Sequence, residues 1–303
     1  MRFSPIWLII FVFTCAATDN LKAAVVNGTI SENTIWTISD SPYLIEDVIY
    51  VKHDVTLTIE PGVRIEFGQD AGLQIDGHII AIGTESDSIR FTSAHNDTAG
   101  SWDGIALNGA TEEAAWTQDG EFTGVGSILQ YCVIEYAGRG FMALGSALVI
   151  NSSSPLISHT KIVNCAGETG TIRCGNLANT LIKNCYVVGN KAIRGGAVSL
   201  GVGSKTILQG NVFALNSAED NGGAIYLAIA EADIISNSFI RNKAGGHGGV
   251  ISAAESKHLV IRNNSILGNS ADFESPGFYF TGQVQADITE NLIDIPQNAI
   301  YLQ

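Results

Sequence analysis

The feature that most constrains this chain is an internal repeat that runs from about residue 127 to residue 303. Similar fragments return about every 26 residues, as in "LIKNCYVVGN", "ILQGNVFALN" and "VIRNNSILGN". Such a period indicates structural units that bury their apolar faces only against neighbouring units. The repeat therefore predicts an elongated solenoid, not a globule built around one compact core.

Alignment of the repeats gives apolar columns that recur once in each period. The first is Leu129, Ile157, Ile182, Leu208, Ile234, Ile261 and Ile288, and the second is Ile134, Ile162, Val187, Phe213, Phe239, Ile266 and Ile293. A further pair is Leu148, Ile172, Val198, Ile225, Ile251, Tyr279 and Ile300, with Ile150, Cys174, Leu200, Leu227, Ala253, Thr281 and Leu302 two residues later. Alternation of this kind is typical of strands with one buried face. Short strands without a helical stripe predict an all-β parallel β-helix whose coils stack about 4.8 Å apart.

Polar residues form columns of their own. One is Cys132, Thr160, Cys185, Asn211, Asn237, Asn264 and Asn291, and another is Asn190, Asn216, Asn242 and Asn269. Asparagines stacked in this way can pass side-chain amide hydrogen bonds from coil to coil. Asparagine also tolerates the left-handed backbone of a sharp corner. We therefore assign these residues a structural role.

The N-terminal residues have the pattern of a secretory leader, and we assign residues 1–24 to it. Arg2 precedes the apolar run "PIWLIIFVFTCAAT", which ends in small residues and is too short for a confident membrane span. A lipid anchor on Cys15 is the weaker alternative. The leader predicts a secreted or cell-surface protein. We predict no transmembrane span.

Residues 25–303 form the predicted β-helix, in three parts. Residues 25–108 give less regular coils, residues 109–126 an inserted loop, and residues 127–303 the regular repeats. The loop places the acidic residues Glu112, Glu113 and Asp119 around the aromatic Trp116. Acidic and aromatic side chains suit a sugar or cation site, although a solvated loop anchored by Trp116 is an equal alternative. Calcium is conceivable there, but no calcium motif supports it, and we assign no cofactor or metal site.

Composition restricts the partners. The net charge is −14, which argues against nucleic acid and anionic membrane surfaces because both require a basic face. The four cysteines of the predicted β-helix are Cys132, Cys165, Cys174 and Cys185, and they show no metal-type spacing. We expect them to fill the core as small apolar side chains.

The segments "NTIWTISDSPYLIEDVIYVKHDVTLTIEPGVRIEFG", "GHIIAIGTESDSIRFTS" and "SWDGIAL" resemble secreted bacterial right-handed parallel β-helix proteins of the pectin-lyase-like superfamily. The pieces "GGAIYL" and "NSFIRN" are similar to repeats of chlamydial polymorphic outer-membrane proteins. The resemblance implies a right-handed coil and an extracellular or outer-membrane-associated location in a bacterium. It does not fix an activity, because the superfamily includes lyases, glycosidases, adhesins and proteins without catalysis.

Resemblance to the polygalacturonases of this fold implies a catalytic set made of Glu219, Asp220 and His247. Those enzymes carry an adjacent acidic pair, a Gly-His-Gly and an Arg-x-Lys on neighbouring coils. Here a third aspartate is missing from "NKAIRGG", and the Arg-x-Lys at residues 241–243 precedes the histidine. Glycine pairs recur on other coils without a histidine, with Arg194, Asn221, His247 and Ser275 in the position before them, so backbone geometry explains them more simply.

The residues predicted to face solvent between the inward positions suggest a binding surface. Those with side chains suited to a ligand are Arg173, Tyr226, Phe280 and Tyr301. The chain also stops within a coil, so a continuation or a partner is expected to cover that open edge. We expect a non-catalytic protein that binds a polysaccharide or another cell-surface glycan or protein, in an adhesive or structural role. A polysaccharide hydrolase or lyase is the alternative.

Overall fold

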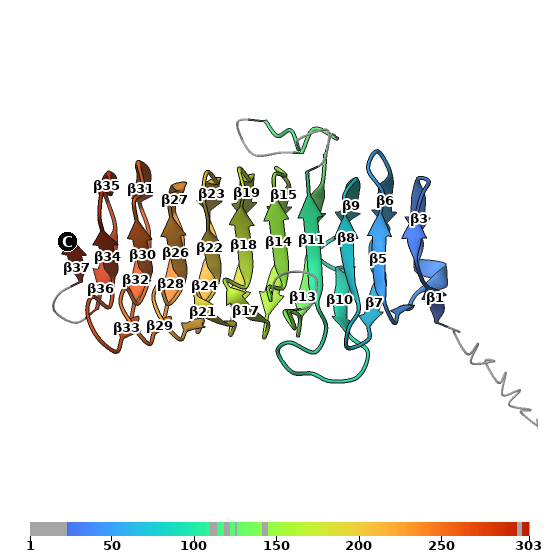
Figure 1. Ribbon diagram of the computed structural model, residues 1–303, viewed down its shortest axis with the longest axis horizontal. Coiled ribbons are helices and arrows are strands. Elements are labelled where there is room, and N and C mark those ends of the chain that lie inside the picture. The colour runs from blue at the N-terminus through green and yellow to red at the C-terminus, as the bar shows by residue number, and fades with distance from the viewer. Residues whose placement is uncertain are drawn as a thin grey trace, which may run out of the picture.

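The computed structural model describes residues 23–109, 114–117, 122–124, 126–140, 145–295 and 299–302. These residues form a right-handed parallel β-helix of about 10 turns, with one short 3-10 helix at Ile38–Asp40. Figure 1 shows the coils side by side along one long axis. The prediction of an all-β solenoid is confirmed.

The strands of the described residues form four parallel sheets, which run along the axis. Sheet A contains β1 (Ala24–Val26), β4 (Tyr43–Ile45), β7 (Arg64–Phe67), β10 (Ile89–Ser93), β13 (Cys132–Glu135), β16 (Lys161–Val163), β20 (Tyr186–Val188), β24 (Val212–Ala214), β28 (Ser238–Ile240), β32 (Ser265–Leu267) and β36 (Leu292–Asp294). Sheet B contains β2 (Thr29–Ile30), β5 (Val48–Val51), β8 (Gly72–Ile75), β11 (Gly104–Asn108), β14 (Leu148–Asn151), β18 (Ile172–Gly175), β22 (Val198–Leu200), β26 (Ile225–Ala228), β30 (Ile251–Ala254), β34 (Phe278–Thr281) and β37 (Ile300–Leu302).

Two further sheets complete the coil. Sheet C contains β3 (Thr34–Trp36), β6 (Thr56–Ile59), β9 (His78–Ile82), β12 (Ile128–Gln130), β15 (Leu156–Ser158), β19 (Asn179–Lys183), β23 (Lys205–Gln209), β27 (Glu231–Ile235), β31 (His258–Arg262) and β35 (Ala286–Thr289). The short sheet D contains β17 (Ala166–Thr169), β21 (Lys191–Arg194), β25 (Ser217–Ala218), β29 (Lys243–Ala244) and β33 (Ser270–Ala271). Along the chain, each coil passes from sheet B to C and then to A, and sheet D lies between A and B on five coils.

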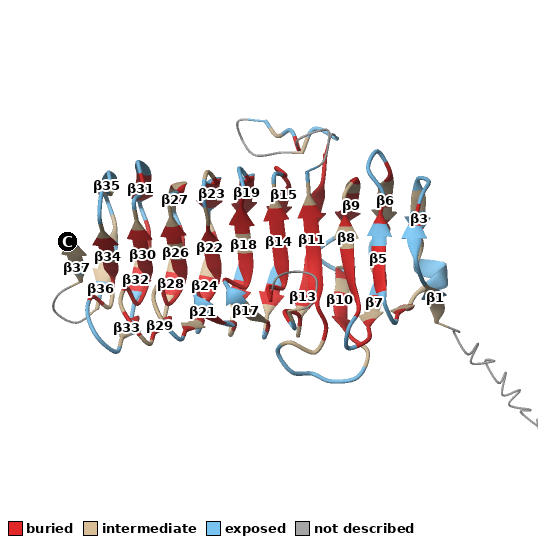
Figure 2. Ribbon diagram, in the orientation of Figure 1, coloured by how far each residue is buried: buried red, intermediate tan, exposed pale blue. Residues whose placement is uncertain are grey.

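Inward side chains from consecutive coils stack on one another and form one continuous core. In sheet A, Ile134 pairs with Ile162 and Ile162 with Val187, and all three are fully buried. Figure 2 shows this burial along the strands from β5 to β34, with exposed residues mainly at the corners and ends. The two apolar columns that include Leu129 and Ile134 are confirmed in every register pair.

The two predicted sheet B columns are confirmed except in one coil, where Tyr279 and Thr281 are wrong by one residue. Ile251 pairs with Phe278 and Ala253 with Phe280, so these two aromatic rings point inward and Tyr279 points outward. Phe280 is 3% exposed and belongs to the core, so it is not part of an outer binding surface. A shift of one residue reverses every side chain of a strand. The sequence could not fix this register because three consecutive aromatic residues have no apolar–polar alternation.

Two buried asparagine ladders join the coils, as predicted. Asn237 Nδ2 donates to the carbonyl oxygen of Leu208 at 2.9 Å and to Oδ1 of Asn264 at 3.1 Å. Its own Oδ1 accepts from the backbone and side-chain nitrogens of Asn211 at 2.9 and 3.0 Å. The second ladder connects Asn190, Asn216, Asn242 and Asn269 in the same manner.

The left-handed corners, however, lie one residue before the ladder asparagines. The residues with positive φ before the first ladder are Tyr131, His159, Asn184, Gly210, Ser236, Asn263 and Glu290, with φ between 50° and 66°. The corner residue turns its side chain to solvent and the next residue points inward. The amide ladder and the corner conformation are therefore separate requirements, met by adjacent positions.

The four described cysteines are free and buried, which confirms their expected role in the core. Burial raises the pKa of the Cys165, Cys174 and Cys185 thiols to about 12, and it also raises the pKa of Cys132. These thiols remain protonated at neutral pH and lack the thiolate that reacts with oxidants and alkylating agents.

We predict that Asn237→Ala lowers the free energy of unfolding by at least about 2 kcal/mol, because it leaves several buried donors and acceptors without partners. Urea unfolding followed by circular dichroism measures this change. Asn179→Ala is the control, since Asn179 is an exposed asparagine on β19. It should change stability by less than about 0.5 kcal/mol. Equal losses in the two variants would contradict a special role for the ladder.

We predict that iodoacetamide at pH 8 leaves Cys132, Cys165, Cys174 and Cys185 unmodified in the folded protein and labels all four after unfolding. With a pKa about 12, only about one thiol in ten thousand is ionised at pH 8. Peptide mass spectrometry measures the labelling. Because the folded pKa lies above the unfolded value, these thiols also destabilise the fold as pH rises from about 9 towards 12. Rapid labelling of the native protein would contradict this burial.

Candidate functional site

The predicted Gly-His-Gly lies in the turn between β29 and β30, and its glycines have a backbone function. Gly248 has a φ of +68°, a conformation that L side chains rarely adopt. A Cβ on Gly249 would lie 2.5 Å from the carbonyl oxygens of Pro276 and Ser270 on the next coil. These glycines therefore allow close coil stacking, as the sequence interpretation expected.

His247 faces the following coil and does not meet the predicted acidic pair. Its ring stacks on Tyr279 with a centroid distance of 4.3 Å and an interplanar angle of 14°. Nδ1 lies 3.9 Å from Oε2 of Glu274. The one-residue shift in this coil therefore puts Glu274, and not the predicted Ser275, opposite His247, since Gly248 N donates to the carbonyl oxygen of Glu274.

Asp220 forms an ion pair with Arg194 of the preceding coil. Its Oδ2 accepts a hydrogen bond from Arg194 Nε at 2.8 Å, and this bond raises the pKa of the guanidinium. Arg194 also lies over the Tyr226 ring, 5.5 Å from its centroid. Glu219 is exposed beside them. Among the described residues, neither Glu219 nor Asp220 forms an ion pair with His247, so the three side chains are not assembled as an acid–base set.

The outer face of sheet B carries a row of polar and aromatic side chains, which we call the sheet B row. In register on consecutive strands from β18 to β37, the positions are Arg173, Ser199, Tyr226, Ser252, Tyr279 and Tyr301. Tyr279 and Tyr301 stack at 5.2 Å, so His247 and these two tyrosines form one continuous stack. The predicted residues Arg173, Tyr226 and Tyr301 therefore share one surface with His247.

The sheet B row contains a guanidinium group and hydroxyl groups that differ in burial. Arg173 Nη1 is buried and has no hydrogen-bond partner among the described residues. Burial, Tyr301 and Glu274 raise the pKa of Tyr279, which keeps its hydroxyl group protonated and able to donate. The row and the neighbouring His247 thus present guanidinium, hydroxyl and imidazole groups, whereas Ser199 and Ser252 of the row are buried.

The described residues of the inserted loop after β11, 114–117 and 122–124, lie over the outer face of sheet C (Figure 1). Trp116 and Phe122 form an antiparallel bridge and pack with Ala114 against an apolar patch on sheet C. That patch includes Ile128, Leu156 and Leu181. This geometry is the one expected for a loop anchored by Trp116. The predicted ligand residues Glu112, Glu113 and Asp119 lie outside the described residues.

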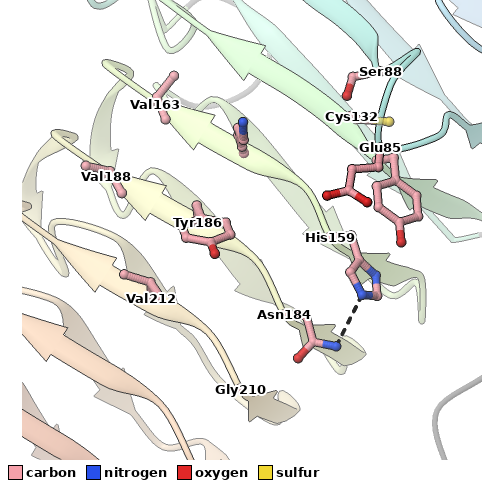
Figure 3. A pocket seen from close by; sticks show the side chains of 12 residues that line it. Glu85, Ser88, Cys132, His159, Val163, Asn184, Tyr186, Val188, Gly210 and Val212 are labelled. Atoms are coloured by element: carbon pink, nitrogen blue, oxygen red, sulfur yellow. Dashed lines mark hydrogen bonds between the residues drawn. The ribbon is translucent and has the colours of Figure 1, made fainter.

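A groove of about 860 Å³ lies on the outer face of sheet A, and we call it the sheet A groove. It extends along the axis from Tyr131 to Val212. Figure 3 shows Glu85 and His159 towards one end, with Tyr186, Val188 and Val212 on the floor towards the other. The sequence interpretation did not include this groove.

One side of the sheet A groove is formed by left-handed corner residues. Tyr131 and His159, both with a φ of 50°, stack at 4.8 Å. Asn184 follows on the next coil, with Nδ2 3.4 Å from His159 Nε2. The next corner residue in the column is Gly210, which has no side chain. The signal in the sequence was the aromatic residue directly before Cys132 and Thr160, where later coils have Asn, Gly, Ser or Glu.

The described residues offer neither a metal site nor a membrane-spanning helix. They contain no group of three or more histidine, cysteine or acidic side chains placed to hold a metal ion. The described part of the chain also has no helix with the length and hydrophobicity needed to cross a bilayer.

Comparison with known proteins supports the fold class. Residues 28–144 match the family model described as a pectate-lyase like beta helix domain. A segment of 69 residues, or 23% of the chain, is 45% identical to Protein bark beetle of Drosophila melanogaster. That segment spans only 2% of the length of the Drosophila protein. No solved structure matches the chain.

We predict that Trp116→Ala releases the inserted loop without unfolding the β-helix. A partly buried aromatic side chain contributes on the order of 1.5 kcal/mol, so protease cleavage between residues 109 and 126 should become about tenfold faster. Limited proteolysis with mass spectrometry measures the rate, and the thermal midpoint should fall by less than about 2 °C. An unchanged cleavage rate would show that Trp116 does not anchor the loop.

Proposed function

We propose that this protein is an exported, non-catalytic β-helix that binds polysaccharide chains along the sheet B row. The proposed ligand is a cell-surface or extracellular glycan, and the proposed role is adhesive or structural. Export rests on the leader-like sequence of residues 1–24. The observation that carries the binding proposal is the continuous stack of His247, Tyr279 and Tyr301, in line with Tyr226 and Arg173.

The orientation of the rings determines what this row can bind. Rings that stack face to face along the axis turn their edges and hydroxyl groups towards solvent. The centroids of His247, Tyr279 and Tyr301 are 4.3 and 5.2 Å apart, so polar groups recur at nearly the spacing of the strands. A polymer that repeats its hydroxyl groups along its length can hydrogen-bond to such a row at several positions.

Charged residues in and beside the sheet B row add hydrogen-bond donors and acceptors. Arg194 and Asp220 are about half exposed despite their mutual ion pair, and each retains hydrogen-bonding capacity. Arg173 is half-buried in the same outer column and adds a positive charge to the row. Sugar hydroxyl groups donate and accept, so this mixture suits a saccharide better than it suits a purely anionic ligand such as nucleic acid, which the net charge of −14 also disfavours.

Rigidity supports binding by this shallow surface. The row stands on strands of sheet B that pair with the equivalent strands of neighbouring coils, and β37, which carries Tyr301, pairs with β34. Side chains fixed before binding lose little conformational entropy when a ligand arrives. A flat row of this kind can therefore bind a long polymer through many modest contacts.

The alternative, a polysaccharide hydrolase or lyase that uses Glu219, Asp220 and His247, lacks a geometric basis among these residues. Glycosidic hydrolysis requires two carboxyl groups at a set separation on either side of the scissile bond. Asp220 is paired with Arg194, and His247 lies against Tyr279 and Glu274. We therefore place catalysis second to binding.

We predict that Tyr301→Ala weakens binding to the preferred polysaccharide about tenfold, which corresponds to about 1.4 kcal/mol. Affinity is measured on immobilised glucan, chitin, galactan and polygalacturonate. Tyr50→Ala is the matched control, because Tyr50 lies on the same outer column of sheet B near its N-terminal end and is 42% exposed. It should bind like the native protein.

The same incubations are assayed for new reducing ends and unsaturated products. Release that disappears in the Asp220→Ala, His247→Ala double variant would favour the enzyme. Absence of binding to every polysaccharide, or equal binding by Tyr301→Ala and the native protein, would contradict the proposed function of the sheet B row.

A further inference from the structure

We propose that the sheet A groove is a second saccharide-binding site, which makes a single chain bivalent for glycan. This inference shares its ligand class with the proposed function but concerns a different face of the β-helix. Sheets A and B lie on separate sides of each coil, with sheet D between them on five coils. A ligand segment in the groove therefore cannot contact the sheet B row at the same time.

The dimensions of the groove suit a short segment of a chain that lies along the axis. The corner residues Tyr131, His159, Asn184 and Gly210 occupy four consecutive coils. Three strand spacings of about 4.8 Å give a length of roughly 14 Å. A volume of about 860 Å³ lies within the range of small-molecule sites. The groove is thus much larger than the space needed for a bound ion.

The floor of the groove offers an apolar surface together with an aromatic ring. Tyr186 is 51% exposed and stands in register between Lys161 and Val212 on sheet A. The half-exposed Tyr186 side chain, Val212, Val163 and Val188 all line the groove and give it an apolar floor. The C–H face of a pyranose ring fits such a surface, because an aromatic face is apolar and weakly negative.

Polar groups line the rest of the groove. Lys161 forms no ion pair with any described carboxylate, and Glu85 and Ser88 form one wall. Asn184 and His159 stand at the corner column, linked at 3.4 Å. Donors and acceptors thus alternate around an apolar floor, which is the arrangement that a ring with hydroxyl groups at its edge and C–H groups on its face requires.

The corner residues give independent support. A left-handed backbone is unfavourable for most non-glycine residues, and asparagine or glycine reduces that cost at Asn184 and Gly210 in the same column. Strain alone does not identify a site, since Leu215 and Ile229 adopt the same conformation at other corners. Only at Tyr131 and His159, among the described corners, do two strained rings stack and line a large groove. Residues held in strained conformations often serve ligand binding.

Bivalency changes what the protein does with a polymer. A chain with two separate saccharide sites can bridge two polysaccharide molecules, or bind one long flexible molecule twice with increased avidity. The sheet B row offers a line of polar edges, whereas the groove offers an enclosed apolar floor. The two sites are therefore expected to differ in sugar preference.

The test uses titration calorimetry of the full chain with hexasaccharides of glucose, N-acetylglucosamine, galactose and galacturonic acid. We expect two binding sites in the native protein. The double variant His159→Asn, Tyr186→Thr should lose one site, and Tyr301→Ala should weaken the other about tenfold. Asparagine tolerates the corner backbone and threonine suits a strand, so the fold should persist. Lys161→Met is a second groove variant that keeps the aliphatic stem and should weaken the same site.

The outcomes separate the two proposals. If both groove variants retain two sites with unchanged affinity, the inference is overturned and the proposed function stands. If the groove variants lose all binding while Tyr301→Ala loses none, the groove is supported and the sheet B row is rejected. If none of the four hexasaccharides binds the native protein, both proposals are rejected. Tyr50→Ala should keep both sites.

Discussion

The in-register stacking of one coil on the next is the constraint on which the rest of this structure depends. Parallel strands pair with the equivalent strands one turn away, so each residue lies against its counterpart in the neighbouring coils. A column of like residues in the sequence therefore forms a row of packed apolar side chains, a chain of hydrogen-bonded amides or a stack of rings. The buried ladder from Asn211 to Asn291 shows the strongest form of this rule, since each amide satisfies the next.

The same rule shapes the outer surfaces. On sheet B it aligns Tyr279 with Tyr301 and brings the His247 ring onto them, although the three residues are separated in sequence. On sheet A it aligns the corner residues Tyr131 and His159. An extended polymer is the natural ligand for such rows, because its own repeat can follow the repeat of the scaffold. The proposals for both faces rest on this correspondence.

Stacking also explains why the predicted catalytic residues are not assembled. Arg194 pairs with Asp220 across one coil step, whereas His247 lies opposite Glu274 of the following coil and stacks on Tyr279 of that same coil. Adjacent residues in a short motif can therefore serve different coils. The resemblance of Gly246-His247-Gly248 to a catalytic motif is accounted for by glycine geometry in the turn, which recurs at Gly195 and Gly222 with positive φ.

The sequence by itself determined the solenoid, its period, the inward columns and the asparagine ladders, because each leaves a repeating pattern of apolar or amide side chains. It also indicated the sheet B row through Arg173, Tyr226 and Tyr301. Only the tertiary structure decided the register of Phe278, Tyr279 and Phe280, since three aromatic residues in succession carry no alternation. It alone revealed the sheet A groove, whose residues come from separate coils and lie partly in turns and partly on the outward face of sheet A strands. Stacking brings them together, and no local pattern records which turn side chains face one another across a coil.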